Sequence, residues 1–359
     1  AMQVAQRGTS STAADYATVD RFRPFHNGTD EAPTQAQADV AAGTTPYTLG
    51  FRKALKITNG NQTSGAGTAD VIEFATRLEA QDLATSGWNY TSTSSFITLS
   101  FWVKSSVAQN FYGQLVTTDG TSQNYPFETG SLSADTWTKI TKAIPGNSNI
   151  QIDNDNGNGF QVNIAAFWGT DFTASNVTED AWGTWSGSAR VKDMTSTWYT
   201  TNDATLEITG VQLEVGSVAT DFEHRSFGQE LALCQRYYYA PFPLGSNTTA
   251  IGVIAAYTTS QSFSVIQFPT TMRAAPSGDI AMGSGYIQMY TTEDTGGSLC
   301  GALTVADLTP QSSRLYYHGF SSSFSSAIGG HGYAMVPSNS FNLCFHLAFC
   351  FCIPYLKTQ

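Results

Sequence analysis

The sequence has few charged residues and no cluster of positive charge. Asp, Glu, Lys and Arg make up 13% of the 359 residues, and 28 acidic against 17 basic side chains give a formal net charge of −11. A nucleic-acid-binding surface needs clustered Lys and Arg to neutralise phosphates, and the chain has no run of either. We therefore expect no nucleic acid among its partners.

Cysteine is confined to the C-terminal third, at positions 234, 300, 344, 350 and 352. No two of these residues form a CxxC pair, and their spacing fits neither a zinc site nor a disulfide framework. The odd number suggests free thiols that are mostly buried, in agreement with the resemblance described below, which implies synthesis in a reducing cytoplasm.

Signal-peptide and membrane-span patterns are missing from the sequence. The opening residues, AMQVAQRGTSS, lack the basic and apolar regions of a signal peptide. The strongest apolar run, from Leu343 to Leu356, is shorter than the roughly 20 residues of a membrane span and contains His346 and Pro354. We expect no membrane insertion.

The usual catalytic patterns are missing as well. The chain has no GxSxG motif and no HxxxH pair. A glycosidase needs two carboxylates that face one another, and no spacing singles out a pair among the candidates Glu73, Asp153, Asp155, Glu179 and Asp180. We therefore expect a protein that is not an enzyme and needs no cofactor, with a polysaccharide depolymerase as an alternative.

Short apolar segments separated by turn residues are abundant. The chain is rich in Ser, Thr, Gly and Asn, a mixture typical of sheets joined by turns. Residues 27–48 are expected to form a long loop with at most one weak strand, and residues 79–84 a helical turn. Strands at the observed spacing are typical of an antiparallel sandwich. They are predicted at 54–58, 71–78, 96–105, 111–117, 136–143, 149–152, 160–168 and 204–213.

The stretch from Leu206 to Tyr239 divides the chain. Its strand ends at Gly216, and residues 228–238 contain helix formers at every interior position, which predicts a short helix. A smaller C-terminal β domain is expected beyond that helix. Its strands are predicted at 250–257, 261–268, 287–292, 314–320, 332–336 and 341–351.

This dividing stretch also carries a resemblance. The order ITGVQLEVG, FEHR, ELALCQRYY is similar to a junction in tail-fibre and virion structural proteins of marine and cyanobacterial tailed phages. MQVAQRGTS and FPTTMRAAP resemble other segments of those proteins, which usually carry a few residues before the first of them. The resemblance implies a virion protein made in the host cytoplasm, with other virion proteins as partners.

A second resemblance covers about residues 50–223. The segments LSFWVKSS, TWTKITKAIP, FWGTDF and ITGVQLEVG occur in this order in jelly-roll carbohydrate-binding modules. Together the two resemblances imply four parts. These are an N-terminal arm (1–25), a carbohydrate-binding-module-like jelly roll (26–225), a connecting helix (226–240) and a C-terminal β domain for assembly or host contact (241–359).

Aromatic residues in Gly-, Ser- and Thr-rich stretches are the candidates for stacking on sugar rings. Trp102 and Trp168 lie in apolar strands and are expected in the core. For any single one of the other aromatic residues, capping of the sandwich or filling of a subunit interface is favoured over glycan stacking. They are Trp88, Tyr90, Trp182, Trp185, Trp198 and Tyr199.

The turn-rich segment DNDNGNG at 153–159 offers oxygen ligands for a structural calcium ion, with Asp153 and Asp155 as the acidic ligands. It lacks the EF-hand spacing, and Asn-Gly and Asp-Asn are also preferred in plain hairpin turns. A plain turn is the favoured interpretation.

Two apolar segments are expected to support assembly. The run from Phe341 to Ile353 is typical of a strand covered on both faces, either by other subunits or inside the C-terminal domain. The phage resemblance implies an intertwined homotrimer. The assembly candidates on the helix and this strand are Leu231, Cys234, Tyr238, Phe345, Phe349 and Phe351.

The sequence thus predicts a virion structural protein, a trimeric tail fibre or fibre-like subunit on the tail or another external surface. It would attach to host-surface polysaccharide without catalysis, and weak sites would be multiplied by avidity. A capsid- or tail-decorating adaptor that binds no glycan is the main alternative.

Overall fold

The computed structural model describes residues 2–241, 249–258, 260–281, 287–291, 298–318, 331–336, 342–346 and 355–357. The chain is mainly β and divides into two compact units. Unit 1 contains Ala1–Glu230 and Phe351–Gln359, and unit 2 contains Leu231–Cys350. Among the described residues, no helix has the length and apolar character needed to span a membrane.

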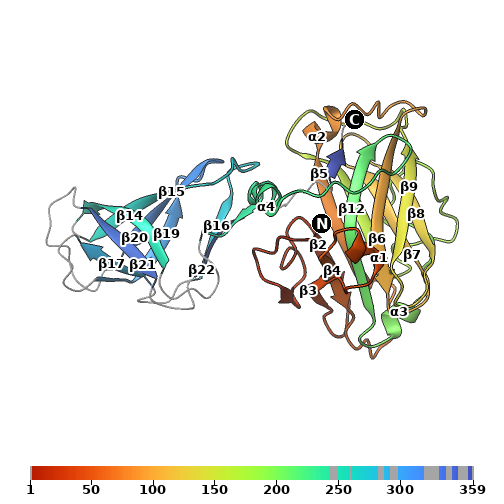
Figure 1. Ribbon diagram of the computed structural model, residues 1–359, viewed down its shortest axis with the longest axis horizontal. Helices are drawn as coiled ribbons and strands as arrows, with labels where there is room; N and C mark the ends of the chain where they lie inside the picture. The colour runs from red at the N-terminus through yellow and green to blue at the C-terminus, as the bar shows by residue number, and fades with distance from the viewer. Residues whose placement is uncertain are drawn as a thin grey trace. The chain divides into compact units, whose positions relative to one another are not determined.

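Unit 1 is an antiparallel jelly-roll sandwich of two sheets (Figure 1). The C-terminal strand β23 (Tyr355–Lys357) adds to the first sheet, parallel to β12 (Thr205–Val215). The first sheet has the order β1 (Ser10–Ser11), β3 (Thr34–Asp39), β4 (Lys53–Thr58), β12 (Thr205–Val215), β6 (Phe96–Ser105) and β9 (Thr138–Pro145). The second has the order β11 (Gly183–Thr184), β8 (Gln123–Ser131), β7 (Asn110–Thr117), β10 (Asn158–Trp168), β5 (Val71–Glu79) and β2 (Arg23–Asn27).

The core lies between these sheets and follows from strand alternation. In β6, the side chains of Ile97, Leu99, Phe101 and Val103 are all completely buried, because alternate residues of a strand face the same side. Each such side chain contributes roughly 1.5–3 kcal/mol through burial. Trp102, the outward neighbour, is only half-buried and packs against a small cluster around Phe51, so its expected core position is wrong.

Irregular pairing changes which side chains face outward. The register of β10 against β5 shifts between Ala165 and Phe167, as expected for a β-bulge. Phe167 therefore belongs to the main core, whereas Trp168 joins a separate apolar cluster with Val71 and Val191. The bulge is what brings Trp168 to the outer side of the second sheet.

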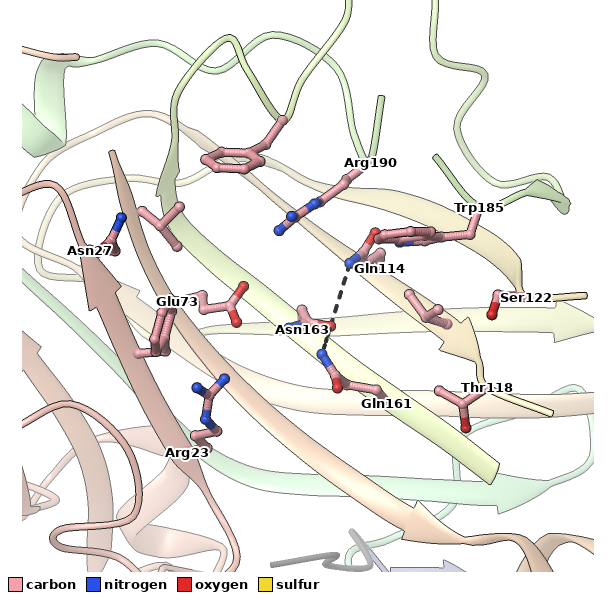
Figure 2. Close-up of a pocket in the computed structure, with 14 residues that line it drawn as sticks. Arg23, Asn27, Glu73, Gln114, Thr118, Ser122, Gln161, Asn163, Trp185 and Arg190 are labelled. Atoms are coloured by element: carbon pink, nitrogen blue, oxygen red, sulfur yellow. Dashed lines mark hydrogen bonds between the residues drawn. The ribbon is translucent and has the colours of Figure 1, made fainter. Parts of the chain in front are cut away.

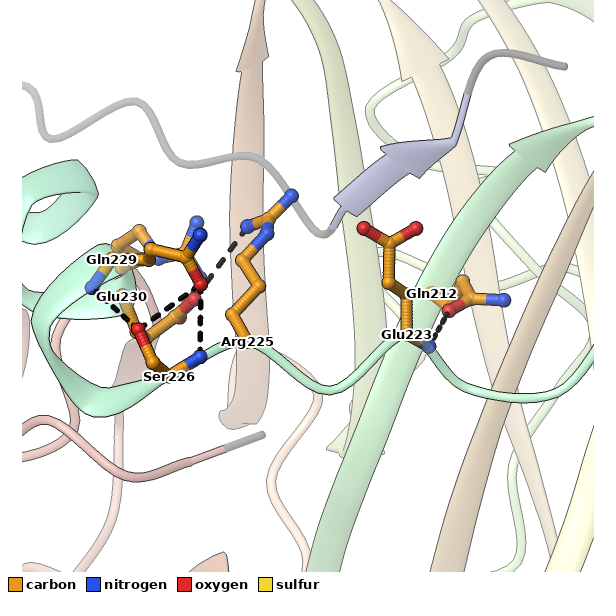
Figure 3. A network of polar contacts seen from close by, with 7 residues as sticks. Gln212, Glu223, Arg225, Ser226, Gln229 and Glu230 are labelled. Carbon is orange, nitrogen blue, oxygen red and sulfur yellow. Dashed lines mark hydrogen bonds and ion pairs between the residues drawn. The ribbon is translucent and has the colours of Figure 1, made fainter.

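Four short helices accompany the strands: α1 (Thr45–Thr48), α2 (Ala80–Ala84), α3 (Thr197–Thr200) and α4 (Phe227–Gln235). The start of α4 has a capping box, in which Ser226 Oγ accepts from the Gln229 N–H and Gln229 Oε1 accepts from the Ser226 N–H (Figure 3). Glu230 is buried and forms ion pairs with Arg21 and Arg225. These contacts fix the first turn of α4 to unit 1.

Unit 2 contains two further antiparallel sheets. β22 (Asn342–His346) lies between β13 (Tyr238–Tyr239) and β16 (Ser277–Ala281). Cys344 and Phe345 are consecutive and both buried, so both faces of β22 are covered at these two residues within the single chain. The larger sheet has the order β18 (Ser298–Cys300), β17 (Ile287–Thr291), β21 (His331–Val336), β14 (Thr249–Thr258), β15 (Gln261–Gln267), β20 (Ser312–His318) and β19 (Ala302–Ala306).

Several expected boundaries differ from those observed. The segment 1–25 is not a separate arm, because Met2, Val4 and Val19 are buried in unit 1. The segment 27–48, expected as a long loop with at most one weak strand, contains the whole of β3 and of the helix α1. The expected strand at 149–152 makes only an isolated bridge, from Gln151 to Asp119. The division between units falls inside α4, after Glu230.

Candidate functional site

A groove of about 530 Å³ lies on the outer face of the second sheet (Figure 2). Strands β2, β5, β7 and β10 form its floor, and the segment that carries Trp185 and Arg190 forms a wall. Its lining comes from side chains that alternate with core residues. On β10, for example, Gln161 and Asn163 line the groove, whereas Phe160, Val162 and Ile164 fill the core.

Three amides form a row across the floor. Gln161 Nε2 donates to Asn163 Oδ1 at 2.9 Å, and Gln114 Nε2 donates weakly to the same oxygen at 3.5 Å (Figure 2). Gln114 is only 3% exposed, and its Oε1 atom is buried without a hydrogen-bond partner. An unsatisfied buried acceptor costs about 1–3 kcal/mol, so a donor brought by a ligand would stabilise this amide.

Glu73 of β5 is the carboxylate in the groove lining. Its Oε2 accepts a hydrogen bond from Trp168 Nε1 at 3.0 Å, which the bulge in β10 makes possible. Burial raises the pKa of Glu73 above 4.5, and the charges of Arg23 and Arg190 oppose that shift only in part. A buried carboxyl group between two guanidinium groups is thus built into the floor.

Arg190 is held among aromatic rings at the wall of the groove. Its guanidinium carbon lies 4.4 Å from the ring centroid of Phe172, 5.4 Å from that of Trp168 and 6.0 Å from that of Trp185. Such cation–π contacts stabilise a desolvated cation. Burial lowers the pKa of Arg190, and the charge of Glu73 opposes this shift.

The backbone of Arg190 is fixed on both sides. Its N–H donates to the Phe172 carbonyl at 2.9 Å, and its own carbonyl accepts from Asn124 Nδ2 at 2.7 Å. Nε of its side chain donates to the Gly187 carbonyl at 3.1 Å. These bonds hold the guanidinium group in one place at the wall.

Arg23 lines the opposite side, and its charge is already paired. It forms an ion pair with Asp15, and its guanidinium carbon lies 4.3 Å from the ring centroid of Phe25. Arg23 and Arg190 therefore differ in how much charge they offer to a ligand.

Trp185 provides the accessible aromatic surface of the groove. It is 40% exposed, whereas most tryptophans of the chain are buried or half-buried. Its backbone N–H donates to the Ser122 carbonyl at 2.9 Å, which anchors it beside β11. An exposed indole beside a row of amides suits a ligand with one apolar face and many hydroxyl groups.

Of the six aromatic candidates, only Trp185 lines this groove. Trp88, Trp198 and Tyr199 are at most 3% exposed and belong to the main core, so none can present a face to a sugar at the surface. Tyr90 is half-buried against that core. Gly- and Thr-rich flanks therefore do not mark surface rings for these three residues, which pack into the core as the capping alternative expects, and Trp198 and Tyr199 do so from the helix α3.

Trp182 lines a separate hollow of about 300 Å³ beside β11. Its Nε1 donates to the Pro145 carbonyl at 2.6 Å, and its ring packs edge-on against Tyr125. Asn124 also lines this hollow, and its Oδ1 atom is buried without a partner.

The polar floor and the arginine wall were not identified from the sequence. The alternation of Gln161 and Asn163 with apolar residues could have indicated one polar face of a strand. Glu73 was considered only as half of a catalytic pair, and its partners come from β2, β10 and the segment at 190. No spacing in the sequence predicts that arrangement.

The proposed calcium segment forms a turn. Asp155 Oδ1 accepts from the Gly157 N–H at 2.8 Å, and the Asp153 N–H donates to Asp119 Oδ2 at 2.9 Å. Within the described part of the chain, no three acidic, histidine or cysteine residues are grouped as metal ligands would be. A calcium ion at Asp153 and Asp155 stays a prediction.

The assembly candidates fall within or near unit 2. Cys234, Tyr238 and Phe345 are buried, and Leu231 is half-buried. Phe349 and Phe351 lie outside the described residues. Burial of the first three is explained by packing within one chain, and the homotrimer stays a prediction.

Comparison with known proteins defines no family for this chain. No family model matches, and no curated protein matches. Among solved structures, the tandem CBM22 domains of Paenibacillus barcinonensis Xyn10C align at 9% identity and TM-score 0.27, over 91% of this chain and 93% of that one. An exo-beta-agarase aligns at 10% identity and TM-score 0.28, over 72% of this chain and 35% of the agarase chain. Discoidin II of Dictyostelium discoideum aligns at 8% identity and TM-score 0.17, over 86% of this chain and 87% of the discoidin chain. Scores this low assign neither a family nor a function.

Proposed function

We propose that unit 1 binds glycans through the groove on its outer sheet. The observation that carries this proposal is the exposed Trp185 indole beside an amide row in which Gln114 Oε1 has no partner. A sugar ring stacks its apolar face on an indole and exchanges hydrogen bonds with amides through its hydroxyl groups. The groove supplies both kinds of contact within one surface.

We also propose that the protein acts on a phage particle, as a fibre or fibre-like subunit that attaches to host-surface polysaccharide. Support comes from the segments ITGVQLEVG, ELALCQRYY and FPTTMRAAP, which resemble those of phage fibres in the same order. A trimer would present three grooves to one polysaccharide surface, and avidity would then raise the overall affinity well above that of a single groove.

Glycan binding is tested by measuring the retention of the purified full chain on immobilised host-envelope polysaccharides. Trp185→Ala should reduce retention several-fold, since an aromatic stacking contact contributes about 0.5–1.5 kcal/mol and about 1.4 kcal/mol corresponds to a tenfold change in affinity. Trp137→Ala is the matched control, because Trp137 is a half-buried tryptophan outside the groove that packs beside Lys104. Equal retention of both variants and the original protein would contradict the proposed site.

The place on the virion separates a fibre from a decorating adaptor. Gold-labelled antibody against the chain, viewed on intact particles by electron microscopy, should mark an external fibre. Labelling confined to the capsid surface, with no glycan retention, would support the adaptor. Shortening of the polysaccharide during incubation would instead indicate a depolymerase.

A further inference from the structure

The half-buried side chain of Arg190 has hydrogen-bond donors that the described part of the protein does not use. Of its five N–H donors, only the one on Nε has a hydrogen bond, to Gly187. Among the described residues, its two terminal nitrogens make no hydrogen bond and no ion pair. A guanidinium group held among three rings with free terminal donors is prepared to receive an anion.

Neighbouring charges do not occupy this guanidinium group. Glu73 accepts from Trp168 and forms no ion pair with Arg190, and Asp15 is paired with Arg23 on the opposite side. The lining contains two arginines and one glutamate, an excess of one positive charge in a chain whose net charge is −11. Because Asp15 already pairs with Arg23, Arg190 is the arginine of the lining that can pair with an anionic ligand.

The distance between stacking surface and charge fits one sugar unit. The guanidinium carbon of Arg190 lies 6.0 Å from the ring centroid of Trp185. Because Arg190 lies over one part of the indole, a sugar stacked on the remaining exposed surface of Trp185 can direct an exocyclic acidic group past the ring toward the terminal nitrogens. The planar fork of an arginine pairs with two oxygens of one such group.

We propose that the groove selects acidic glycans, and that Arg190 binds the carboxylate or sulfate group of the sugar stacked on Trp185. This inference rests on the proposed glycan binding and adds the class of ligand. Gln114 and Asn163 would bind hydroxyl groups, which any sugar offers, and Arg190 would supply the selectivity.

Paired polymers that differ only in charge test this selectivity. We would measure binding of the full chain to polygalacturonate and to its methyl ester, and to a sulfated galactan before and after desulfation. At least one of the two acidic polymers should bind about tenfold or more tighter than its neutralised partner, since charge-assisted hydrogen bonds are strong. The measurement is made at low salt because salt screens this interaction. The first pair tests carboxylate and the second tests sulfate.

Arg190→Gln should remove most of the preference for the acidic polymer, and Arg190→Lys should retain part of it because the charge remains. Arg52→Gln is the matched control, because the Arg52 guanidinium carbon also lies over an aromatic ring, 3.9 Å from the Tyr47 centroid, outside the groove. Thermal unfolding of each variant checks that it is folded.

The outcomes separate this inference from the proposed function. Equal binding of acidic and neutral partners, or an acidic preference that survives in folded Arg190→Gln, would overturn the selectivity and leave glycan binding intact. Failure to bind any of the four polymers or the host polysaccharides would overturn both.

Discussion

The indole nitrogen of Trp168 donates a hydrogen bond of 3.0 Å to the carboxylate of Glu73, beneath the groove of unit 1. Neither residue is more than 5% exposed. This contact depends on the β10 bulge, which turns Trp168 to the outer side of the sheet while Phe167 stays in the core. It fixes the one carboxylate of the lining and makes its ionisation depend on the fold.

Glu73→Gln should change how stability depends on pH. Because burial raises the pKa of Glu73, its contribution to stability is fully present below pH 4.5 and is lost as pH rises through the raised value. The glutamine keeps an acceptor for Trp168 and cannot ionise. The variant should therefore gain stability relative to the original protein as pH rises above 4.5.

Urea unfolding at a series of pH values measures this difference. Asp39→Asn, at a carboxylate whose side chain is 81% exposed, serves as the control and should show little change. If Glu73→Gln instead became relatively less stable as pH rises, the two arginines would outweigh the effect of burial.

Tyr199→Phe should destabilise unit 1. The Tyr199 hydroxyl donates to Asp70 Oδ2 at 2.8 Å, and both residues are buried. Asp70 would keep its bond from the Gly67 N–H at 2.6 Å and lose one donor. We expect a loss of about 1–3 kcal/mol in the free energy of unfolding, measured in urea. Tyr90→Phe is the control, since the Tyr90 hydroxyl makes no hydrogen bond to the described residues, and equal effects would contradict this account.

Gly113→Ala should destabilise the floor of the groove. A Cβ atom at position 113 would lie 2.4 Å from Phe127 Cζ and 2.6 Å from the Asn163 carbonyl oxygen. Overpacking of this kind costs about 1–3 kcal/mol, and the shift of Asn163 should weaken glycan retention as well. Gly183→Ala, where a Cβ would meet nothing within 4 Å, should leave the melting temperature nearly unchanged.

Cys234→Asp should disrupt folding or assembly before it affects the groove. Cys234 is 2% exposed on α4, and a buried carboxylate without a designed partner costs several kcal/mol. Ala232→Asp places the same charge on an exposed position of that helix. Thermal unfolding and sedimentation would be compared for the two, and an unchanged oligomer of unchanged stability in Cys234→Asp would contradict a structural role for α4. Replacing Leu231 with Asp should have a similar, smaller effect, because Leu231 is only half-buried.

Local pattern determined much of the fold. The apolar alternation of residues 96–105 predicts β6 with its observed bounds, and the helix formers at 228–238 predict α4 with small differences at its ends. Strand β8, with the sequence QNYPFETGS, was missed because its proline and polar residues weaken the alternation, and pairing with β7 and β11 supplies what the local signal lacks.

The residues that form the groove could be identified only from the tertiary structure. Sequence reasoning found the exposed Trp185 but grouped it with Trp88, Trp198 and Tyr199, whose burial only packing decides. Arg23, Glu73, Gln114, Asn163 and Arg190 come from separate strands and a loop, and sheet pairing brings them to one face. Alternation within a strand is a local property that a sequence shows, whereas the meeting of polar faces from distant strands depends on strand order and on a bulge, which only the folded chain determines.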